Sequence, residues 1–133
     1  MAQNILFVCV ENAGRSQMAE AFFKKYGKNK FDVISAGTIP ATKLNPIVVS
    51  VMDEIGIDMT FQTPKLLSGD MIEQSFKTIN MGCVDKESCP ALFVKDIVDW
   101  NISDPKNKTI EQVRIIRDDI KSNVLKMIDS FND

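Results

Sequence analysis

A short, continuous apolar segment near the start of the chain constrains the fold more than any other feature. Residues 4–10 read Asn-Ile-Leu-Phe-Val-Cys-Val, without the polar–apolar alternation of a strand that has one face in water. Such a run is typical of a strand buried on both faces of a parallel sheet. A helical pattern follows at residues 16–26, so we expect a loop over residues 9–16 that joins the first strand to a helix.

Strand and helix patterns alternate along the rest of the chain. We expect strands at residues 31–35, 76–81 and 96–100, the last at a sheet edge, helices at 46–56 and 109–131, and a weaker helical pattern at 63–72. Asn45 and Pro46 suit the N-cap and first position of a helix. The apolar stripe of the last helix consists of Val113, Ile116, Ile120, Val124, Leu125 and Ile128. This order predicts an α/β fold whose parallel sheet has helices on both faces.

The length and charge of the chain limit its organisation and its partners. We expect a single domain over residues 1–133. No stretch approaches the ~20 apolar residues that span a membrane, and residues 1–4 lack the features of a signal peptide. We therefore expect a cytoplasmic protein with no membrane partner. The net charge of -2 supplies no basic field for nucleic acid, so an anionic ligand would need a local site.

The chain has no histidine and three cysteines, Cys9, Cys83 and Cys89. The missing imidazole excludes Ser-His-Asp and Cys-His catalysis as well as histidine-ligated zinc. An odd number of cysteines argues against a disulfide framework. Three roles stay open for these side chains: core residue, metal ligand or reactive thiol. Metal ligation is the weakest, because Cys83 and Cys89 are too widely spaced for a zinc motif and no further ligands complete a site.

The loop after the first strand has the composition of an oxyanion site. Its residues are Cys9, Val10, Glu11, Asn12, Ala13, Gly14, Arg15 and Ser16. Backbone N–H groups converge at a helix N-terminus, and the helix dipole adds partial positive charge, so a tetrahedral oxyanion can bind there. Arg15 can hold two of its oxygens, and the Ser16 hydroxyl could donate to a Cys9 thiolate that the same field favours. The alternative is that Cys9 is an apolar core residue at a strand end.

Several motifs occur together that mark a known family. They are Cys9-x5-Arg15-Ser16, Met18-Ala19-Glu20, Ser35-Ala36-Gly37 and Asp104-Pro105. In these motifs the chain resembles the low-molecular-weight protein tyrosine phosphatase superfamily over almost its whole length, and most closely its thioredoxin-coupled arsenate reductases. The resemblance implies a three-layer fold with a four-stranded parallel sheet of order 2-1-3-4. In that order the first and third strands are neighbours.

The resemblance also implies a thiol relay. Cys9 would attack arsenate held by the loop and Arg15, with Asp104 as general acid. Cys83 would then attack the Cys9 sulfur, and Cys89 would move the disulfide to the Cys83–Cys89 pair, which thioredoxin reduces. The implied enzyme is a monomer without metal or organic cofactor, and phosphate or sulfate would act as analogues of arsenate. The alternatives to these catalytic roles are purely structural: Asp104 forms a turn, and Cys83 and Cys89 are structural residues.

Two departures from the family pattern bear on ion binding. Asn12 organises the loop by resemblance, and three further positions match those that bind a structural potassium ion with it in some members: Glu20, Ser35 and Thr63. Lys65 stands where those members have an acidic ligand, so we expect its ammonium in the place of the cation. Glu11 is the second departure, because an acidic side chain in an anion loop must point outward or weaken binding.

Three functions are therefore open. The leading hypothesis is reduction of arsenate to arsenite, with weak phosphatase side activity. The alternative is a low-molecular-weight protein tyrosine phosphatase or small phosphate-ester phosphatase that uses Cys9, Arg15 and Asp104. Aryl phosphatases of this superfamily usually carry aromatic residues after Asp-Pro and a second cysteine in the loop, whereas this chain has Lys106 and Gly14 there. The third is a phosphocarrier or thiol-redox binding module, which would not need a leaving-group acid.

Overall fold

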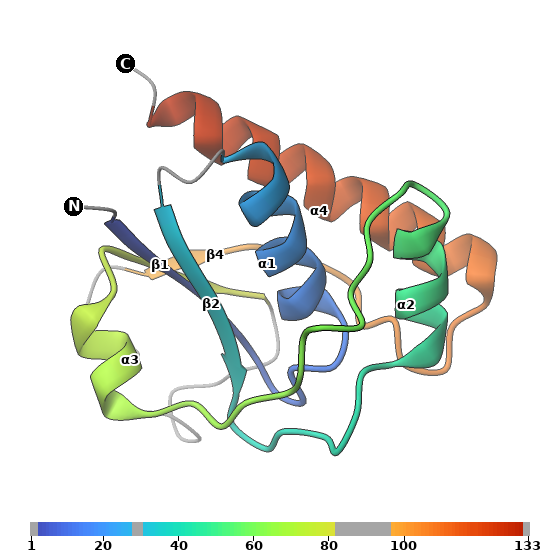
Figure 1. The fold of residues 1–133 in the computed structure, drawn as a ribbon, viewed down its shortest axis with the longest axis horizontal. Helices are drawn as coiled ribbons and strands as arrows, with labels where there is room; N and C mark the ends of the chain where they lie inside the picture. Colours follow the sequence, from blue (N-terminus) through green and yellow to red (C-terminus); the bar gives the residue numbers. More distant parts are fainter. Residues whose placement is uncertain (1–2, 28–30, 82–96, 132–133) are drawn as a thin grey trace.

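The structure is a computed structural model that describes residues 3–27, 31–81 and 97–131. Its elements follow as β1 (Gln3–Cys9), α1 (Arg15–Tyr26), β2 (Phe31–Gly37), α2 (Pro46–Asp53), α3 (Gly69–Gln74), β3 (Lys77–Asn80), β4 (Ile97–Asp99) and α4 (Ile110–Ser130) (Figure 1). Apart from the weak pattern at 63–72, the strands and helices lie within a few residues of their predicted positions. No helix within the described ranges is long and apolar enough to cross a membrane.

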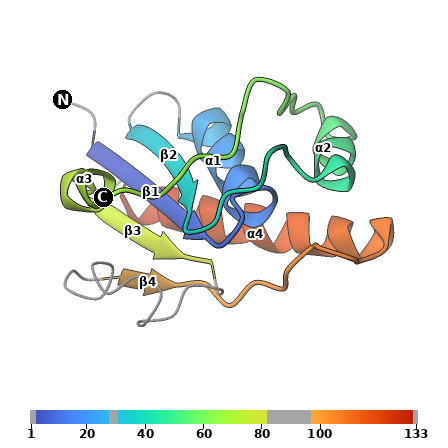
Figure 2. The same ribbon diagram turned by 90° about the horizontal axis from the view of Figure 1, so that it is seen from below.

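The four strands form one parallel sheet in the order β2-β1-β3-β4 (Figure 2). The expected α/β class, the strand order and the edge position of the last strand are confirmed. β1 pairs with β2 along one edge and with β3 along the other, so it is an interior strand of the sheet. Because the strands share one direction, their carboxyl ends meet at one edge, where Cys9 pairs with Gly37 of β2 and Val8 with Asn80 of β3.

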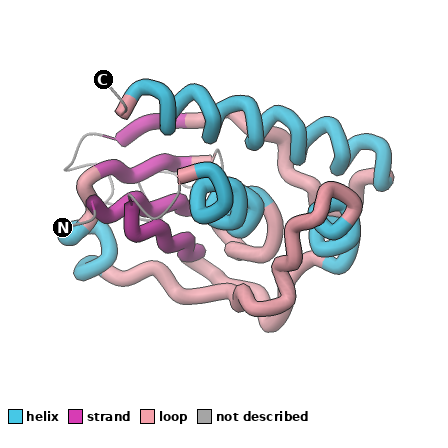
Figure 3. The backbone as a smooth tube through the Cα atoms, turned by 45° about the horizontal axis from the view of Figure 1, so that its top comes forward, coloured by secondary structure: helices cyan, strands magenta, loops and turns pink. Residues whose placement is uncertain are grey.

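Side chains of β1 alternate between two apolar clusters, one on each face of the sheet. Ile5 and Phe7 lie in the larger cluster with residues of α1, α2 and α4, whereas Leu6 and Val8 pack in the smaller one with Ile72 of α3. Figure 3 shows α1 beside α4, with α3 apart from them across the strands. Helices thus cover both faces, as expected, but among the described residues the second face has one short helix.

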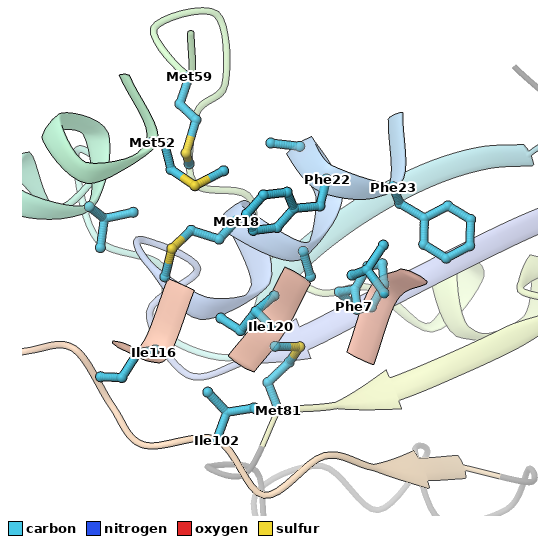
Figure 4. Close-up of a cluster of buried hydrophobic side chains, with 14 of the residues drawn as sticks. Phe7, Met18, Phe22, Phe23, Met52, Met59, Met81, Ile102, Ile116 and Ile120 are labelled. Atoms are coloured by element: carbon cyan, nitrogen blue, oxygen red, sulfur yellow. The ribbon is translucent and has the colours of Figure 1, made fainter. Parts of the chain in front are cut away.

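Aromatic packing in the larger cluster holds α1 on the sheet. The Phe7 ring centroid is 6.0 Å from that of Phe23 in α1 and 5.5 Å from that of Trp100, which follows β4. Met18 of α1 is fully buried in the same cluster (Figure 4). Phe7 precedes the loop between β1 and α1 and Met18 follows it, so the core fixes both ends of that loop.

α4 carries most of its predicted apolar stripe into the core. Five members are buried, namely Val113, Ile116, Ile120, Val124 and Ile128. The sixth, Leu125, is exposed, because it follows Val124 directly and is turned by about 100° from it around the helix. Beside the stripe, the buried Arg117 donates a 2.8 Å hydrogen bond to the carbonyl of Val51 and so ties α4 to α2.

The helix expected at residues 63–72 is wrong in position. The chain there runs alongside the end of β2: Gly37 donates to the Lys65 carbonyl and accepts from the Leu67 N–H, both at 2.8 Å. Pro64 lacks a backbone N–H and disfavours helical geometry in the residue before it. Helix α3 begins only after Ser68, whose hydroxyl caps it. The extended segment brings residues 62–65 to the loop between β1 and α1.

Gly37 should tolerate no side chain. A Cβ there would overlap the Val10 carbonyl oxygen and lie 3.0 Å from the Asn12 Cβ. We expect Gly37→Ala to lower the free energy of unfolding by about 1–3 kcal/mol, because closely packed backbone must move apart. Urea denaturation measures this. Gly69→Ala is the matched control, since a Cβ there meets no described atom within 4 Å; equal losses in both variants would contradict the close approach.

Candidate active site

A small pocket lies at the carboxyl edge of the sheet, at the loop between β1 and α1. Its volume is about 220 Å³, and its lining consists of Cys9, Val10, Glu11, Ala13, Gly14, Arg15, Asn45, Asp104, Pro105 and Lys106. The predicted site residues Cys9, Arg15 and Asp104 therefore surround one cavity. A larger hollow of about 850 Å³ beside α1 and β2 has none of these three in its lining. Cys83 and Cys89 lie outside the described residues, and their part in the site stays a prediction.

The carbonyl groups of the loop are engaged on its outer side. Four of them accept hydrogen bonds from the segment after β2: Cys9 from Thr38 (3.2 Å), Val10 from Ile39 (2.9 Å), Glu11 from Ala41 (2.9 Å) and Ala13 from Asn45 (2.9 Å). The N–H and C=O of a trans peptide unit point in opposite directions, so the loop N–H groups turn toward the pocket. They can bind an anion in a protein whose net charge is negative.

Asn12 sets the hydrogen bonds at the thiol. Its φ of 52° is left-handed, a conformation that asparagine adopts more readily than most residues. Its Oδ1 accepts from the Lys65 N–H (2.8 Å) and from Gln17 Nε2 (2.9 Å). The side-chain Nδ2 is therefore the group that donates to Ser16 Oγ (2.7 Å). Since Ser16 Oγ accepts this bond, its own hydrogen can point to Cys9 Sγ, 2.9 Å away.

The sulfur of Cys9 is thus arranged as a hydrogen-bond acceptor. The Ser16 hydroxyl donates to it, as does the Asn12 N–H at 3.3 Å, and Cys9 is only 3% exposed. Both donors lie at the junction between β1 and α1, so they hold the sulfur at the edge of the pocket, where a nucleophile can meet a bound anion. The structure brings Ser16 and Cys9 into the contact that the sequence analysis expects.

Arg15 is the first residue of α1, and its side chain is buried against the ends of two other strands. Its Nη1 donates to the carbonyls of Met81 (3.0 Å) and Ile102 (3.1 Å), beyond β3 and β4. Its Nη2 lies 3.7 Å from Asp104 Oδ2. These contacts fix the guanidinium at the wall of the pocket, where a planar fork of donors suits the oxygens of a tetrahedral anion.

Asp104 stands at the rim of the pocket, with 52% of its side chain exposed. Its Oδ1 accepts from the Lys106 N–H at 3.0 Å, which holds the carboxylate in a turn. The next residue, Pro105, packs on Gly14: a Cβ at Gly14 would lie 2.8 Å from Pro105 Cγ. Glycine at this position therefore allows the loop that carries Asp104 to approach the start of α1.

Glu11 belongs to the lining of the pocket, and its carboxylate is paired with a lysine. Its Oε1 accepts a 2.8 Å hydrogen bond from Lys106 Nζ. This hydrogen bond and the charge of Glu11 raise the pKa of Lys106, so the ammonium stays charged throughout the neutral range. The ion pair joins the loop after β1 to the loop before α4. No pattern in the sequence marks Lys106 as the partner of Glu11.

Two glutamines that the sequence analysis did not single out support Asn12. Gln17 is fully buried, and its Nε2 donates to the carbonyls of Asn12 (3.0 Å) and Thr63 (2.9 Å) as well as to Asn12 Oδ1. Gln62 Nε2 in turn donates to Gln17 Oε1 at 2.6 Å. A polar side chain next to the loop motif, in the first turn of a helix with a buried face, is a signal that could have pointed to Gln17.

Comparison with known proteins assigns the chain to a family. The chain matches the low molecular weight phosphotyrosine protein phosphatase family over residues 4–133. It belongs to this family. A candidate arsenate reductase of Halobacterium salinarum is 38% identical over 135 residues, which cover 95% of this chain and 91% of that protein.

Two solved structures of arsenate reductases share the fold. One, in the phosphate binding state, has a TM-score of 0.83 and 30% identity, covering 96% of this chain and 98% of its own. The other, a thioredoxin-dependent arsenate reductase of Corynebacterium glutamicum, has a TM-score of 0.81 and 33% identity, covering 97% of this chain and 61% of its own. The resemblance found in the motifs of the sequence is confirmed.

The Lys65 ammonium lies beside two of the residues that match a potassium site in some phosphatase family members, Glu20 and Thr63. Lys65 Nζ donates to the Thr63 carbonyl (3.0 Å) and lies 3.6 Å from Glu20 Oε1. Glu20 also accepts from Ser35 Oγ (2.8 Å) and Lys24 Nζ (2.7 Å). Because the Lys65 ammonium already balances this carboxylate, the residues present do not fit a monovalent cation. Within the described ranges, no group of three or more His, Cys, Asp or Glu side chains could hold a metal ion.

Loss of the Ser16 hydroxyl should make Cys9 less reactive. At pH 7 we expect alkylation of Cys9 by iodoacetamide to slow by about tenfold in Ser16→Ala, because a hydrogen bond to a charged acceptor contributes roughly 1.5–3 kcal/mol. Mass spectrometry of the Cys9 peptide measures the rate. Ser122→Ala, on the exposed side of α4, is the control. Equal rates for Ser16→Ala and wild type at pH 7 would refute the donor role.

Potassium should have no specific effect on the wild-type protein. We expect the same Tm and the same activity in KCl as in NaCl, since Lys65 supplies the positive charge beside Glu20. Lys65→Met should lower the Tm by several degrees, because Glu20 is buried and loses one of its two ammonium partners. Thermal unfolding in both salts tests this, with Lys126→Met on α4 as control. A higher wild-type Tm in KCl would contradict the assignment.

Proposed function

We propose that this protein reduces arsenate to arsenite through a relay of three cysteine thiols. The observation that carries the proposal is the hydrogen-bonded sulfur of Cys9 in one pocket with Arg15 and Asp104, on a chain related to arsenate reductases. The reaction needs an anion site, a nucleophile and an acid, and these three residues supply them together with the loop N–H groups.

In the first step, the loop N–H groups and Arg15 bind arsenate. The Cys9 thiolate attacks arsenic, an S–As bond forms, and Asp104 donates a proton to the oxygen that leaves as water. Among the described residues, two carboxyl groups line the pocket, those of Asp104 and Glu11. The Glu11 carboxylate is already engaged by the ammonium of Lys106, and the chain has no histidine. These facts support Asp104 as the acid.

In the second step, the Cys83 thiolate attacks the Cys9 sulfur. The electron pair of the S–As bond stays on arsenic, which leaves as arsenite, and a Cys9–Cys83 disulfide forms. Cys89 then attacks Cys83, which frees Cys9 and leaves a Cys83–Cys89 disulfide. The position of Met81 supports this order, because its N–H donates to the Val8 carbonyl at 2.9 Å and Cys83 follows two residues later, a span of at most about 7 Å.

The proposed reductant of the Cys83–Cys89 disulfide is thioredoxin. Phosphate and sulfate are proposed as competing analogues, since both are compact tetrahedral oxyanions. A relay of free thiols suits a reducing compartment, so we place the reaction in the cytoplasm. One chain carries every group that the scheme requires, and a monomer is sufficient.

Hydrolysis of aryl phosphates is the second candidate activity. The match to a phosphotyrosine phosphatase family favours it, and the same thiolate can attack phosphorus in place of arsenic. Lys106 and Gly14, at positions where aryl phosphatases of the superfamily usually carry an aromatic residue and a second cysteine, favour reduction as the main activity.

Arsenate-dependent oxidation of NADPH tests the proposal, with thioredoxin and thioredoxin reductase supplied. We expect turnover by the wild type and a loss of at least about 100-fold in Cys9→Ser and Cys83→Ser, since each removes a thiol that forms a covalent bond. Hydrolysis of p-nitrophenyl phosphate by Cys83→Ser should persist, which serves as the folding control. A wild type that hydrolyses this ester without oxidising NADPH would favour the phosphatase, and full turnover by Cys83→Ser would reject the relay.

A further inference from the structure

Two hollows meet at the ion pair between Glu11 and Lys106. The inner one is the 220 Å³ pocket that Cys9 lines, and the outer one, of about 540 Å³, lies between the start of α2 and the loop after Pro105. Four residues line both hollows: Glu11, Ala13, Asn45 and Lys106. The ion pair therefore stands at the boundary between the two.

Contacts of the main chain hold both partners of the pair in place. The Glu11 carbonyl accepts from the Ala41 N–H at 2.9 Å, and the Lys106 N–H donates to Asp104 Oδ1 at 3.0 Å. The partners are 95 residues apart in the sequence, and the 2.8 Å contact from Lys106 Nζ to Glu11 Oε1 joins their loops. The side chains thus bridge two fixed walls of the pocket.

The charge of Glu11 alone would oppose anion binding. A carboxylate several ångströms from an oxyanion weakens its binding by roughly 3–10-fold at the effective dielectric of a protein surface. Lys106 cancels that charge. An ion pair between partly exposed side chains is also weak, so it opens readily to let a small anion enter and closes again behind it.

The two kinds of substrate place different demands on this pair. The inner pocket holds the volume of about seven water molecules at ~30 Å³ each, enough for a tetrahedral oxyanion. An aryl ester adds a ring of six carbons, and the outer hollow beyond the ion pair offers the room for it. A free oxyanion can bind with the pair closed, whereas an ester holds it open.

We propose that the Glu11–Lys106 ion pair selects free tetrahedral oxyanions over their organic esters. The inference rests on the proposed function, because it explains how a pocket of the phosphatase family favours arsenate over aryl phosphates. Lys106 is a specificity-determining residue in this scheme, and Glu11 is its anchor.

The test compares an ester with a free anion that carries the same head group. We measure kcat/KM for p-nitrophenyl phosphate, and the Kd of inorganic phosphate from its protection of Cys9 against iodoacetamide. The product of kcat/KM and Kd cancels charge effects common to both ligands. We expect this product to rise about tenfold in both Glu11→Gln and Lys106→Met, because either change breaks the pair.

The phosphate Kd alone should respond differently in the two single variants. It should rise by roughly 3–10-fold in Lys106→Met, which leaves Glu11 without its counter-charge, and should not rise in Glu11→Gln. The double variant Glu11→Lys with Lys106→Glu restores the pair and should return the product to the wild-type value. Lys126→Met removes one positive charge about 24 Å along α4 from its first residue and should change neither quantity.

An unchanged product in both single variants would overturn the proposal, as would a rise in only one of them. Ester hydrolysis that is undetectable in the wild type but measurable in both variants would support it. Neither readout uses arsenate reduction. A wild type that binds phosphate without oxidising NADPH would therefore refute the proposed function alone, whereas an unchanged product in an enzyme that reduces arsenate would refute only the selection by the pair.

Discussion

The direction of the peptide groups in the loop after β1 is the constraint on which the site depends. The carbonyls of residues 9–13 accept hydrogen bonds from partners outside the loop. Backbone N–H groups of residues 38–45 donate to four of them, and the Gln17 side chain donates to that of Asn12. The loop N–H groups must then turn inward. In a chain of net charge -2, these dipoles and one buried arginine, rather than a basic surface, hold the anion.

Lys65 contacts both this loop and a buried carboxylate, that of Glu20. Its backbone N–H donates to Asn12 Oδ1, while its ammonium lies beside the buried Glu20 and donates to the Thr63 carbonyl. Glu20 in turn accepts from Ser35 in β2. One residue thus orients the side chain that directs Ser16 toward the thiol and also neutralises a buried carboxylate. A covalently attached cation makes this support independent of the ions in solution, whereas a bound ion contributes only in proportion to its occupancy.

The sequence predicted the local elements well, because each depends on its own periodicity. The apolar run of β1, the Asn45-Pro46 start of α2 and the stripe of α4 are of this kind. The order of the strands came from the family resemblance, since periodicity does not specify which strands pair. Repulsion from an anion predicted that Glu11 either points outward or weakens binding, but its pairing with Lys106, 95 residues away, depends on the tertiary fold. The helix predicted at 63–72 was wrong for the same reason, because the extended conformation there depends on the long-range hydrogen bonds of Lys65 and Leu67 with Gly37.

Gly14 links the shape of the pocket to the redox chemistry proposed for it. A side chain there would press on Pro105, 2.8 Å from the position of its Cβ, and would push away the loop that carries Asp104. With glycine at this position, the loop carries one thiol, that of Cys9, which is buried and hydrogen-bonded to Ser16 and Asn12. An oxidised Cys9 then has no disulfide partner within its own loop, so the resolving thiol must come from another segment or from another molecule. The Gly14–Pro105 contact thus agrees with the proposed relay, in which Cys83 supplies that thiol.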